Sequence, residues 1–396
     1  MRPQNLLILS RTTFLYYSRP MRRIRTCCSA FAVLLACLVM PAAGRVSGVG
    51  QSHKPRPARD PESELRTGTQ LTRQGRFSDA IPHLLAARAG AGDQYAVKFN
   101  LALCYVATRQ PKVAIPVLAS LQKGGTNTAA VWNLLAQAYV GDGQSDKALE
   151  AVKRAAALSP GDEKLYSFVA DACTDARNNR LGLKVVELGL QSVPDSARLH
   201  YERAVFLTGL DRFDLAKNDF LTASRLASGT GIGYLAAAHE KLLEGDSAET
   251  IRIARDAIAK GKANYILRSL LGEALIQSGV DVGEPGFAEA EGTLQESITE
   301  RPSYSRSRIS LAKLYLMGDR VDEAISQLET ARTLDPENPA VYSYLAAAFR
   351  RKGDLSQARE ALAVLARLNN EQVTSIREEG ATNGEHRGNV AKVRNQ

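Results

Sequence analysis

The chain has 396 residues, too many for one ordinary compact core, so it holds either several domains or a repeat array whose units pack on their neighbours. Its net charge of +9 lies entirely in residues 1–60, which carry ten basic residues and one acidic residue. Residues 61–396 are therefore neutral and lack the basic field that drives binding to phosphates. We expect no nucleic-acid partner.

Residues 1–44 are expected to form an export leader, with the signal peptide in residues 21–44. Arg22, Arg23 and Arg25 give it a positive start, and the apolar stretch that follows ends in a proline and three small residues. This stretch is shorter than the roughly 20 residues that a membrane-spanning helix needs, which favours cleavage over anchoring. We therefore expect an exported chain that is periplasmic or associated with the cell envelope.

Two alternatives to cleavage stay open for this leader. A Leu-Leu-Ala-Cys sequence that ends at Cys37 would make this cysteine a lipidation site, and a leader that escapes cleavage would anchor the chain in the membrane. Translation begins at either Met1 or Met21. After the leader, residues 45–60 are rich in Arg, Pro and Gly and are expected to form a flexible linker.

A 34-residue repeat occupies most of the remaining chain, and residues 129–162 show it most clearly: AAVWNLLAQAYVGDGQSDKALEAVKRAAALSPGD. Counted from its first residue, the unit has pattern residues at places 4, 7, 8, 11, 20, 24, 27 and 32: Trp132, Leu135, Ala136, Tyr139, Ala148, Val152, Ala155 and Pro160. Such spacing predicts two antiparallel helices joined by a tight turn.

Places 8 and 20 carry small residues along the whole array. Place 8 is Gly or Ala in each unit: Gly68, Ala102, Ala136, Ala170, Ala204, Ala238, Gly272, Ala312 and Ala346. Place 20 is almost as uniform: Ala80, Ala114, Ala148, Gly182, Ala216, Thr250, Ala290, Ala324 and Ala358. We expect the two helices of a hairpin to touch at these places, with larger apolar residues at places 7, 11 and 24 filling the space between hairpins.

The pattern resembles the tetratricopeptide repeat family. The resemblance implies an all-α fold, a right-handed superhelical solenoid of about nine helix-turn-helix units within residues 61–372. Its units are 61–94, 95–128, 129–162, 163–196, 197–230, 231–264, 265–304, 305–338 and 339–372. Stacking supplies the core, because no hairpin buries its apolar face alone.

Prolines at place 32 are expected to end the second helices, and Asp162, Asp195 and Asn338 to cap the helices that follow. The seventh unit contains a six-residue insertion within residues 279–286, where three glycines and a proline predict a loop. Residues 373–396 are polar and charge-balanced and are expected to be disordered.

Two units depart from the pattern. Arg203 occupies place 7 and Lys241 occupies place 11, although both places usually hold an apolar residue. Either packing is relaxed in the fifth and sixth units, or the two residues mark a place where something binds.

We expect no catalytic, cofactor-binding or metal site, and hence no enzyme. The five histidines are scattered without a helical pair or a cysteine cluster beside them. Cys104 and Cys173 are the two cysteines beyond the leader and are expected to be buried packing residues.

The resemblance also implies where a partner lies, because ligands of the family contact places 2, 5, 9, 12 and 13 of the first helices on the concave face. The family's chaperone-tail clamp needs basic and asparagine residues at several of these places, whereas place 5 holds no basic residue and a single asparagine, Asn133, so we do not expect that clamp. The remaining pattern gives a mixed apolar and polar set of candidate contacts: Phe99, Asn133, Gln137, Asp171, Tyr201, His239, Glu273 and Lys313.

These expectations lead to a non-enzymatic scaffold of the cell envelope or periplasm that binds segments of partner proteins. The alternative is an accessory subunit of a polysaccharide synthesis or export complex. Self-association also stays open, because the array ends on Leu362 and Leu365 without a polar capping helix.

Overall fold

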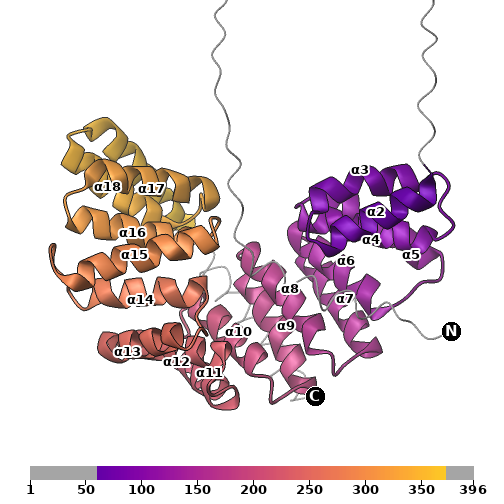
Figure 1. Cartoon of the computed structure of the whole chain (residues 1–396), viewed down its shortest axis with the longest axis horizontal. Helices are drawn as coiled ribbons and strands as arrows, with labels where there is room; N and C mark the ends of the chain where they lie inside the picture. The colour runs from indigo at the N-terminus through magenta and orange to yellow at the C-terminus, as the bar shows by residue number, and fades with distance from the viewer. Residues whose placement is uncertain (1–59, 372–396) are drawn as a thin grey trace, which may run out of the picture. The chain divides into compact units, whose positions relative to one another are not determined.

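A computed structural model describes residues 60–371, and these residues form helices and turns without a β-strand. The all-α class is therefore confirmed. The helices run as follows: α2 Pro61–Arg73, α3 Phe77–Ala87, α4 Gln94–Ala107, α5 Pro111–Lys123, α6 Ala129–Gly141, α7 Ser145–Leu158, α8 Glu163–Asp175, α9 Asn179–Ser192, α10 Ala197–Thr208, α11 Phe213–Leu226, α12 Gly231–Glu244, α13 Ser247–Ala259, α14 Tyr265–Gln277, α15 Pro285–Glu300, α16 Ser305–Met317, α17 Val321–Leu334 and α18 Pro339–Lys352 (Figure 1). A further helix begins at Leu355 and continues to residue 371.

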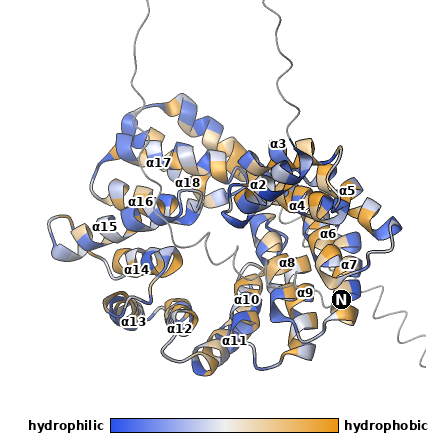
Figure 2. Cartoon of the chain, turned by 45° about the vertical axis from the view of Figure 1, so that its right-hand side comes forward, coloured by the Kyte–Doolittle hydropathy of each residue, from blue (hydrophilic) through white to orange (hydrophobic). Residues whose placement is uncertain are grey.

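The chain divides into two compact units, one ending at Leu158 and the other beginning at Ser159. Within each unit, consecutive helices pack as antiparallel hairpins, α2 with α3 and so on to α16 with α17. The helices carry hydrophilic and hydrophobic residues side by side, as expected for amphipathic elements that bury one face (Figure 2). The leader, the linker and the tail lie outside the described residues.

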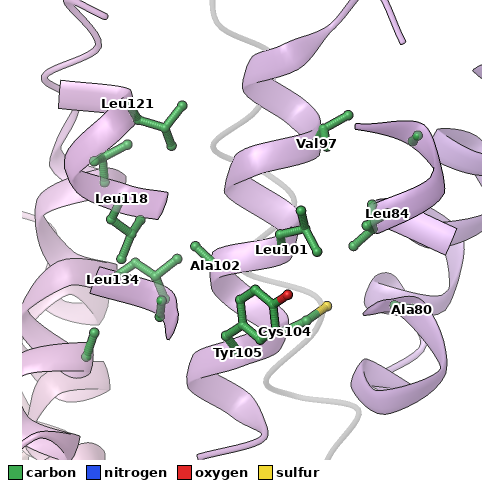
Figure 3. Close-up of a cluster of buried hydrophobic side chains, with 14 of the residues drawn as sticks. Ala80, Leu84, Val97, Leu101, Ala102, Cys104, Tyr105, Leu118, Leu121 and Leu134 are labelled. Atoms are coloured by element: carbon green, nitrogen blue, oxygen red, sulfur yellow. The ribbon is translucent and has the colours of Figure 1, made fainter. Parts of the chain in front are cut away.

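The small residues at places 8 and 20 let the two helices of each hairpin pack closely. The alanines at places 8 and 20 are at most 3% exposed, as Ala136 and Ala148 illustrate at 0%. Figure 3 shows the same arrangement in the first unit, where α4 points Leu101 toward Leu84 of α3 and Ala102 toward the neighbouring helices on its other side. Close approach of the backbones thus leaves room for one layer of larger apolar side chains.

Glycine replaces alanine at three of these places for a steric reason. A Cβ atom on Gly272 would lie 2.5 Å from Cγ of Leu294, and one on Gly68 would lie 2.6 Å from Cγ of Leu84. At Gly182 the obstacle is the ring of Phe206, 2.3 Å away. The absent side chain is therefore what lets the larger neighbour fit.

The turn inside each hairpin has a feature that we did not predict. Place 15 has a left-handed backbone in all nine units: Gly75, Arg109, Gly143, Arg177, Asp211, Gly245, Gly279, Asp319 and Gly353. In every hairpin except the one with the insertion, the N–H of place 16 donates to the carbonyl of place 11, as from Gln144 to Tyr139 (2.9 Å). This bond defines a Schellman motif, which requires the left-handed residue.

Helix starts and stops follow local chemistry. The helices α7, α9, α15 and α17 each end two residues before the proline at place 32. Asp162 caps α8 and Asn338 caps α18 through their side-chain oxygens. The prediction for Asp195 is wrong: Ser196 directly precedes α10, and its Oγ accepts from the N–H of Leu199 at 3.0 Å.

The two departures from the repeat pattern are compensated by ion pairs. Arg203 on α10 donates from Nε to Asp219 of α11 at 2.6 Å, and His200 Nδ1 lies 2.8 Å from the same carboxylate. Lys241 pairs with Glu244 at 2.8 Å. The fifth and sixth units thus replace apolar contacts with salt bridges.

Candidate functional site

The inner side of the second unit is formed by first helices. Beyond contacts between helices adjacent in the chain, α8 packs on α10, α10 on α12, α12 on α14, α14 on α16 and α16 on α18. Each of these is the first helix of its hairpin. Because the first helices approach one another while the second helices cover their outer side, the unit curves with its first helices inside.

Aromatic side chains form the floor of this inner face. The Oη of Tyr201 on α10 lies 3.3 Å from Nδ1 of His239 on α12, and the His239 ring stacks on Phe220 with centroids 5.0 Å apart. Tyr201 and His239 are only 8% and 9% exposed. Burial, with a smaller contribution from the charge of Arg306, lowers the pKa of His239 to about 3, so the imidazole is neutral.

An ion pair between α14 and α16 stands on one side of this floor. Arg306 donates from Nε and Nη2 to the two carboxylate oxygens of Glu273, at 2.8 Å and 2.7 Å. Hydroxyls of Ser269 and Ser310 donate to the same carboxylate. Glu273 raises the pKa of Arg306 above its ordinary value. Because the Arg306 side chain is still 48% exposed, the pair presents a fixed charge to a partner.

A second charged group connects α8 and α10. Arg198 bridges two carboxylates, donating from Nη2 to Asp171 at 3.0 Å and from Nε to Glu202 at 2.6 Å. Asp171 is 45% exposed, whereas Glu202 is buried and its Oε2 has no hydrogen-bond partner within the described residues. Burial raises the pKa of Glu202 to about 8, with Arg198 opposing the shift.

Three of the predicted contact residues come together here: Tyr201, His239 and Glu273. Asp171 joins the Arg198 network beside them, and Lys313 is exposed on α16. Their role in binding stays a prediction. Tyr201 and His239 are more buried than contact residues on an open concave face would be, because they pack on each other and on Phe220.

The other predicted residues belong to the first unit. Phe99 on α4 stacks on Tyr95 with ring centroids 5.7 Å apart. Asn133 on α6 is buried and accepts a hydrogen bond from Nε2 of Gln137 at 2.7 Å. These three residues lie in the first unit, whereas Tyr201 lies in the second.

The two arginines of the inner face were not among the predicted contact residues. Arg198 and Arg306 both stand at place 2, one of the places that ligands of the family contact. Their shared place in the repeat could have identified both arginines as candidate contact residues. Nothing in the sequence, however, indicates that each arginine would be held by acids from a neighbouring first helix.

The two cysteines are buried, free thiols. Burial raises the pKa of Cys104 to about 11 and that of Cys173 to about 12, so both are protonated at neutral pH. Within residues 60–371, no group of three potential metal ligands comes together. Over the same range, no helix has the length and apolar character needed to cross a membrane.

Comparison with known families finds the repeat in both halves of the chain. Family profiles described as tetratricopeptide repeat match residues 71–138 and 319–377, residues 286–339 and residues 129–162. The chain is a tetratricopeptide repeat (TPR) protein. TPR proteins bind other proteins or peptides and are generally non-enzymatic, so this TPR chain is a protein interaction scaffold.

Individual relatives resemble limited parts of this TPR protein. Intraflagellar transport protein 70A of Xenopus laevis is 30% identical over 80 residues, and the match covers 20% of this chain and 12% of the relative. The Xenopus tropicalis counterpart is 29% identical over the same share of each chain. The chain thus spans only a small part of the length of these relatives.

Solved TPR structures share low sequence identity with the chain. The APC/C hetero-tetramer Cut9-Hcn1 is 12% identical, with a TM-score of 0.46 over 72% of this chain and 55% of that one. A tetratricopeptide repeat protein from Parabacteroides merdae is 16% identical, with a TM-score of 0.44 over 73% of this chain and 98% of that one.

Proposed function

We propose that this TPR protein is an exported scaffold of the cell envelope or periplasm that binds segments of partner proteins on the inner face of its second unit. The supporting observation is the pairing of fixed, half-exposed charges with an aromatic floor. Arg306 and Asp171 are each held in place by an oppositely charged neighbour yet remain about half exposed. Side chains that are already ordered lose little entropy when a partner binds.

The chemistry of this face favours a segment with both charged and apolar residues. Asp171 places an exposed acid on α8, whereas Arg306 and Lys313 place bases on α16. A partner segment with complementary charges would gain orientation from both sides, because electrostatic complementarity fixes register and rejects wrong partners. Apolar residues of the same segment would pack on exposed parts of the first helices.

The export part of the proposal rests on the leader in residues 1–44. Its basic start, apolar stretch and small residues support secretion, with cleavage preferred over anchoring or lipidation of Cys37. Fractionation of cells that produce the chain with a C-terminal tag tests this part. A soluble periplasmic product that lacks the leader supports it, and a cytoplasmic product of full mass contradicts it.

Affinity capture from envelope extracts tests the binding part. The bait is the mature chain, compared with Arg306→Ala on the inner face and with Arg252→Ala as the matched control. Arg252 lies on the second helix α13, is 67% exposed and also pairs with a nearby glutamate. We expect a partner that Arg306→Ala loses and Arg252→Ala retains. Equal capture by all three baits would contradict the proposal.

The identity of the captured protein separates two pathways. Recovery of assembly factors or proteases would support a general envelope scaffold. Recovery of glycan-synthesis or glycan-export proteins would favour the alternative, an accessory subunit of a polysaccharide synthesis or export complex.

A further inference from the structure

An ion pair joins two parts of the second unit that are far apart in the sequence. Arg177, in the turn between α8 and α9, donates from Nη2 to Oδ2 of Asp335, which follows the end of α17. The two residues are 158 positions apart and belong to the fourth and eighth repeats. This contact brings the fourth and eighth repeats together, so the row of first helices between them bends strongly and the space along its inner face is narrow.

The Asp335 carboxylate is held in place by its own neighbours. It is 5% exposed, and its Oδ2 also accepts from Oγ of Ser305 at 3.2 Å and from Nδ2 of Asn338 at 2.9 Å. A carboxylate fixed by two donors from the eighth repeat and its following loop has little freedom to follow a moving partner. Movement at this contact therefore has to come from Arg177 and the fourth repeat.

Arg177 has a left-handed backbone, as do the non-glycine residues at three equivalent turns, Arg109, Asp211 and Asp319. Its φ is +54°, in the left-handed region that five of the nine equivalent turns satisfy with glycine. A non-glycine residue in this conformation carries a strain that persists only where the surrounding structure favours it. The guanidinium of Arg177 is 47% exposed, and it forms an ion pair with Asp335.

Residues between the end of α15 and the start of α16 lie close enough to α8 and α10 to act on the pKa values of residues there. The charge of Arg301, at the end of α15, acts on Asp171 of α8. Arg306 and Tyr304 similarly act on Tyr201 of α10. The fourth and fifth repeats thus lie near residues 301–306, where the seventh repeat ends and the eighth begins.

We propose that the Arg177–Asp335 ion pair is a latch that keeps the aromatic floor of Tyr201, Phe220 and His239 covered, and that a partner segment bound to the exposed charges reaches this floor only when the latch opens. The partner half of this statement rests on the proposed function. The closure itself concerns this chain alone. The latch also sets a threshold for binding, because the competent state is a minor part of the ensemble until the pair breaks.

The rate of chemical modification of His239 measures how often the latch opens, and the measurement needs no partner. Diethyl pyrocarbonate reacts with neutral, accessible imidazoles, and mass spectrometry locates the adduct. His239 is 9% exposed, and His83 in the first unit serves as the internal reference. The full chain is compared as wild type, Arg177→Gly, Arg177→Lys and Asp211→Gly.

Arg177→Gly removes the guanidinium and suits the left-handed turn, so the hairpin stays folded. We expect it to raise the modification rate of His239 about tenfold, as the loss of one charge-assisted hydrogen bond would raise the open population. Arg177→Lys should stay near the wild-type rate. Asp211→Gly makes the same backbone change at an exposed, equivalent turn and should leave the rate unchanged.

An unchanged His239 rate in Arg177→Gly overturns the latch, whatever is captured from extracts. An equal increase in Asp211→Gly also overturns it, because general loosening would then explain the effect. If Arg177→Gly alone exposes His239 and the Arg306-dependent partner is absent, the latch stands and the proposed function fails. If that partner binds Arg177→Gly more tightly than wild type, both stand.

Discussion

Single side chains decide how closely the hairpins pack, and the place-8 glycines show this most sharply. In Gly272→Ala the new methyl group would collide with Leu294, which is fully buried. We expect overpacking of about 1–3 kcal/mol to exceed the gain in helix propensity of roughly 1 kcal/mol, so the free energy of unfolding falls by about 1 kcal/mol.

Gly292→Ala, in α15 of the same hairpin, is the control for this prediction. A Cβ atom there meets nothing within 4 Å, so only the helix-propensity gain remains and stability should rise by up to about 1 kcal/mol. Urea unfolding followed by circular dichroism measures both variants. If Gly272→Ala is as stable as Gly292→Ala, the close approach of the two helices is not what the fold requires.

The left-handed turn residues permit a prediction in the opposite direction. Asp319 has a φ of +55° and an exposed side chain, and glycine would relieve the strain, so Asp319→Gly should stabilise the chain by about 0.5–1 kcal/mol. Gly143→Ala places a Cβ atom at φ +74° and should destabilise it by about 1 kcal/mol. Thermal unfolding midpoints that move the other way would contradict the assignment of these turns.

The buried carboxyl of Glu202 makes stability depend on pH. Its pKa is about 8 in the folded chain against 4.5 for an unperturbed glutamate, so the folded state holds the proton more tightly than the unfolded state does. Stability is therefore greatest below pH 4.5 for this group and is lost as the pH rises toward 8.

Glu202→Gln should remove this loss. Between pH 6.5 and pH 8 the His239 imidazole, whose pKa is about 3 in the folded chain and 6.5 when unperturbed, titrates in the same way in both proteins, so its contribution cancels in the comparison. We expect wild type to lose about 2 kcal/mol over that interval relative to Glu202→Gln. Parallel urea midpoints for the two proteins at both pH values would show that Glu202 is not protonated in the fold.

At the scale of the element, the α10–α11 hairpin is held by the buried Asp219 and its partners Arg203 and His200. Arg203→Leu alone would leave a carboxylate that is 4% exposed with one cation fewer, at a cost of about 3–5 kcal/mol. Arg203→Leu combined with Asp219→Leu should recover most of that stability, because apolar residues then fill the place as in other repeats.

A double-mutant cycle of urea unfolding free energies tests the exchange of salt bridge for apolar packing. The control is Lys241→Leu, which breaks a more exposed pair with Glu244 and should therefore destabilise the chain much less. Additive costs for the two α10–α11 substitutions would mean that Arg203 and Asp219 do not act as a pair.

Local spacing explains why so much of each element could be predicted. Places 8 and 20 are defined by contacts within 34 residues, and Pro160 or Asn338 acts on the helix beside it. The turn at place 15 was also visible, since five of nine units carry glycine there. By contrast, the pairing of Arg203 with Asp219 depends on side-chain reach between two helices, which hydrophobic periodicity does not encode.

At the scale of the whole molecule, the candidate site is less predictable than the repeats that build it. Tyr201, His239 and Glu273 were selected because of their places, and the structure gathers them. Their burial, and the return of Arg177 to Asp335, follow from small rotations between hairpins that accumulate over four repeats. A sequence pattern specifies each rotation too loosely to give the sum.

Site-specific photocrosslinking in cells shows whether the inner face of the second unit binds a partner protein. Lys313 is exposed on the first helix α16, and the exposed Arg252 on the second helix α13 is the outer control. We expect one discrete crosslinked protein from a photoreactive residue at Lys313 and none from one at Arg252. Crosslinks from Arg252 alone would contradict it.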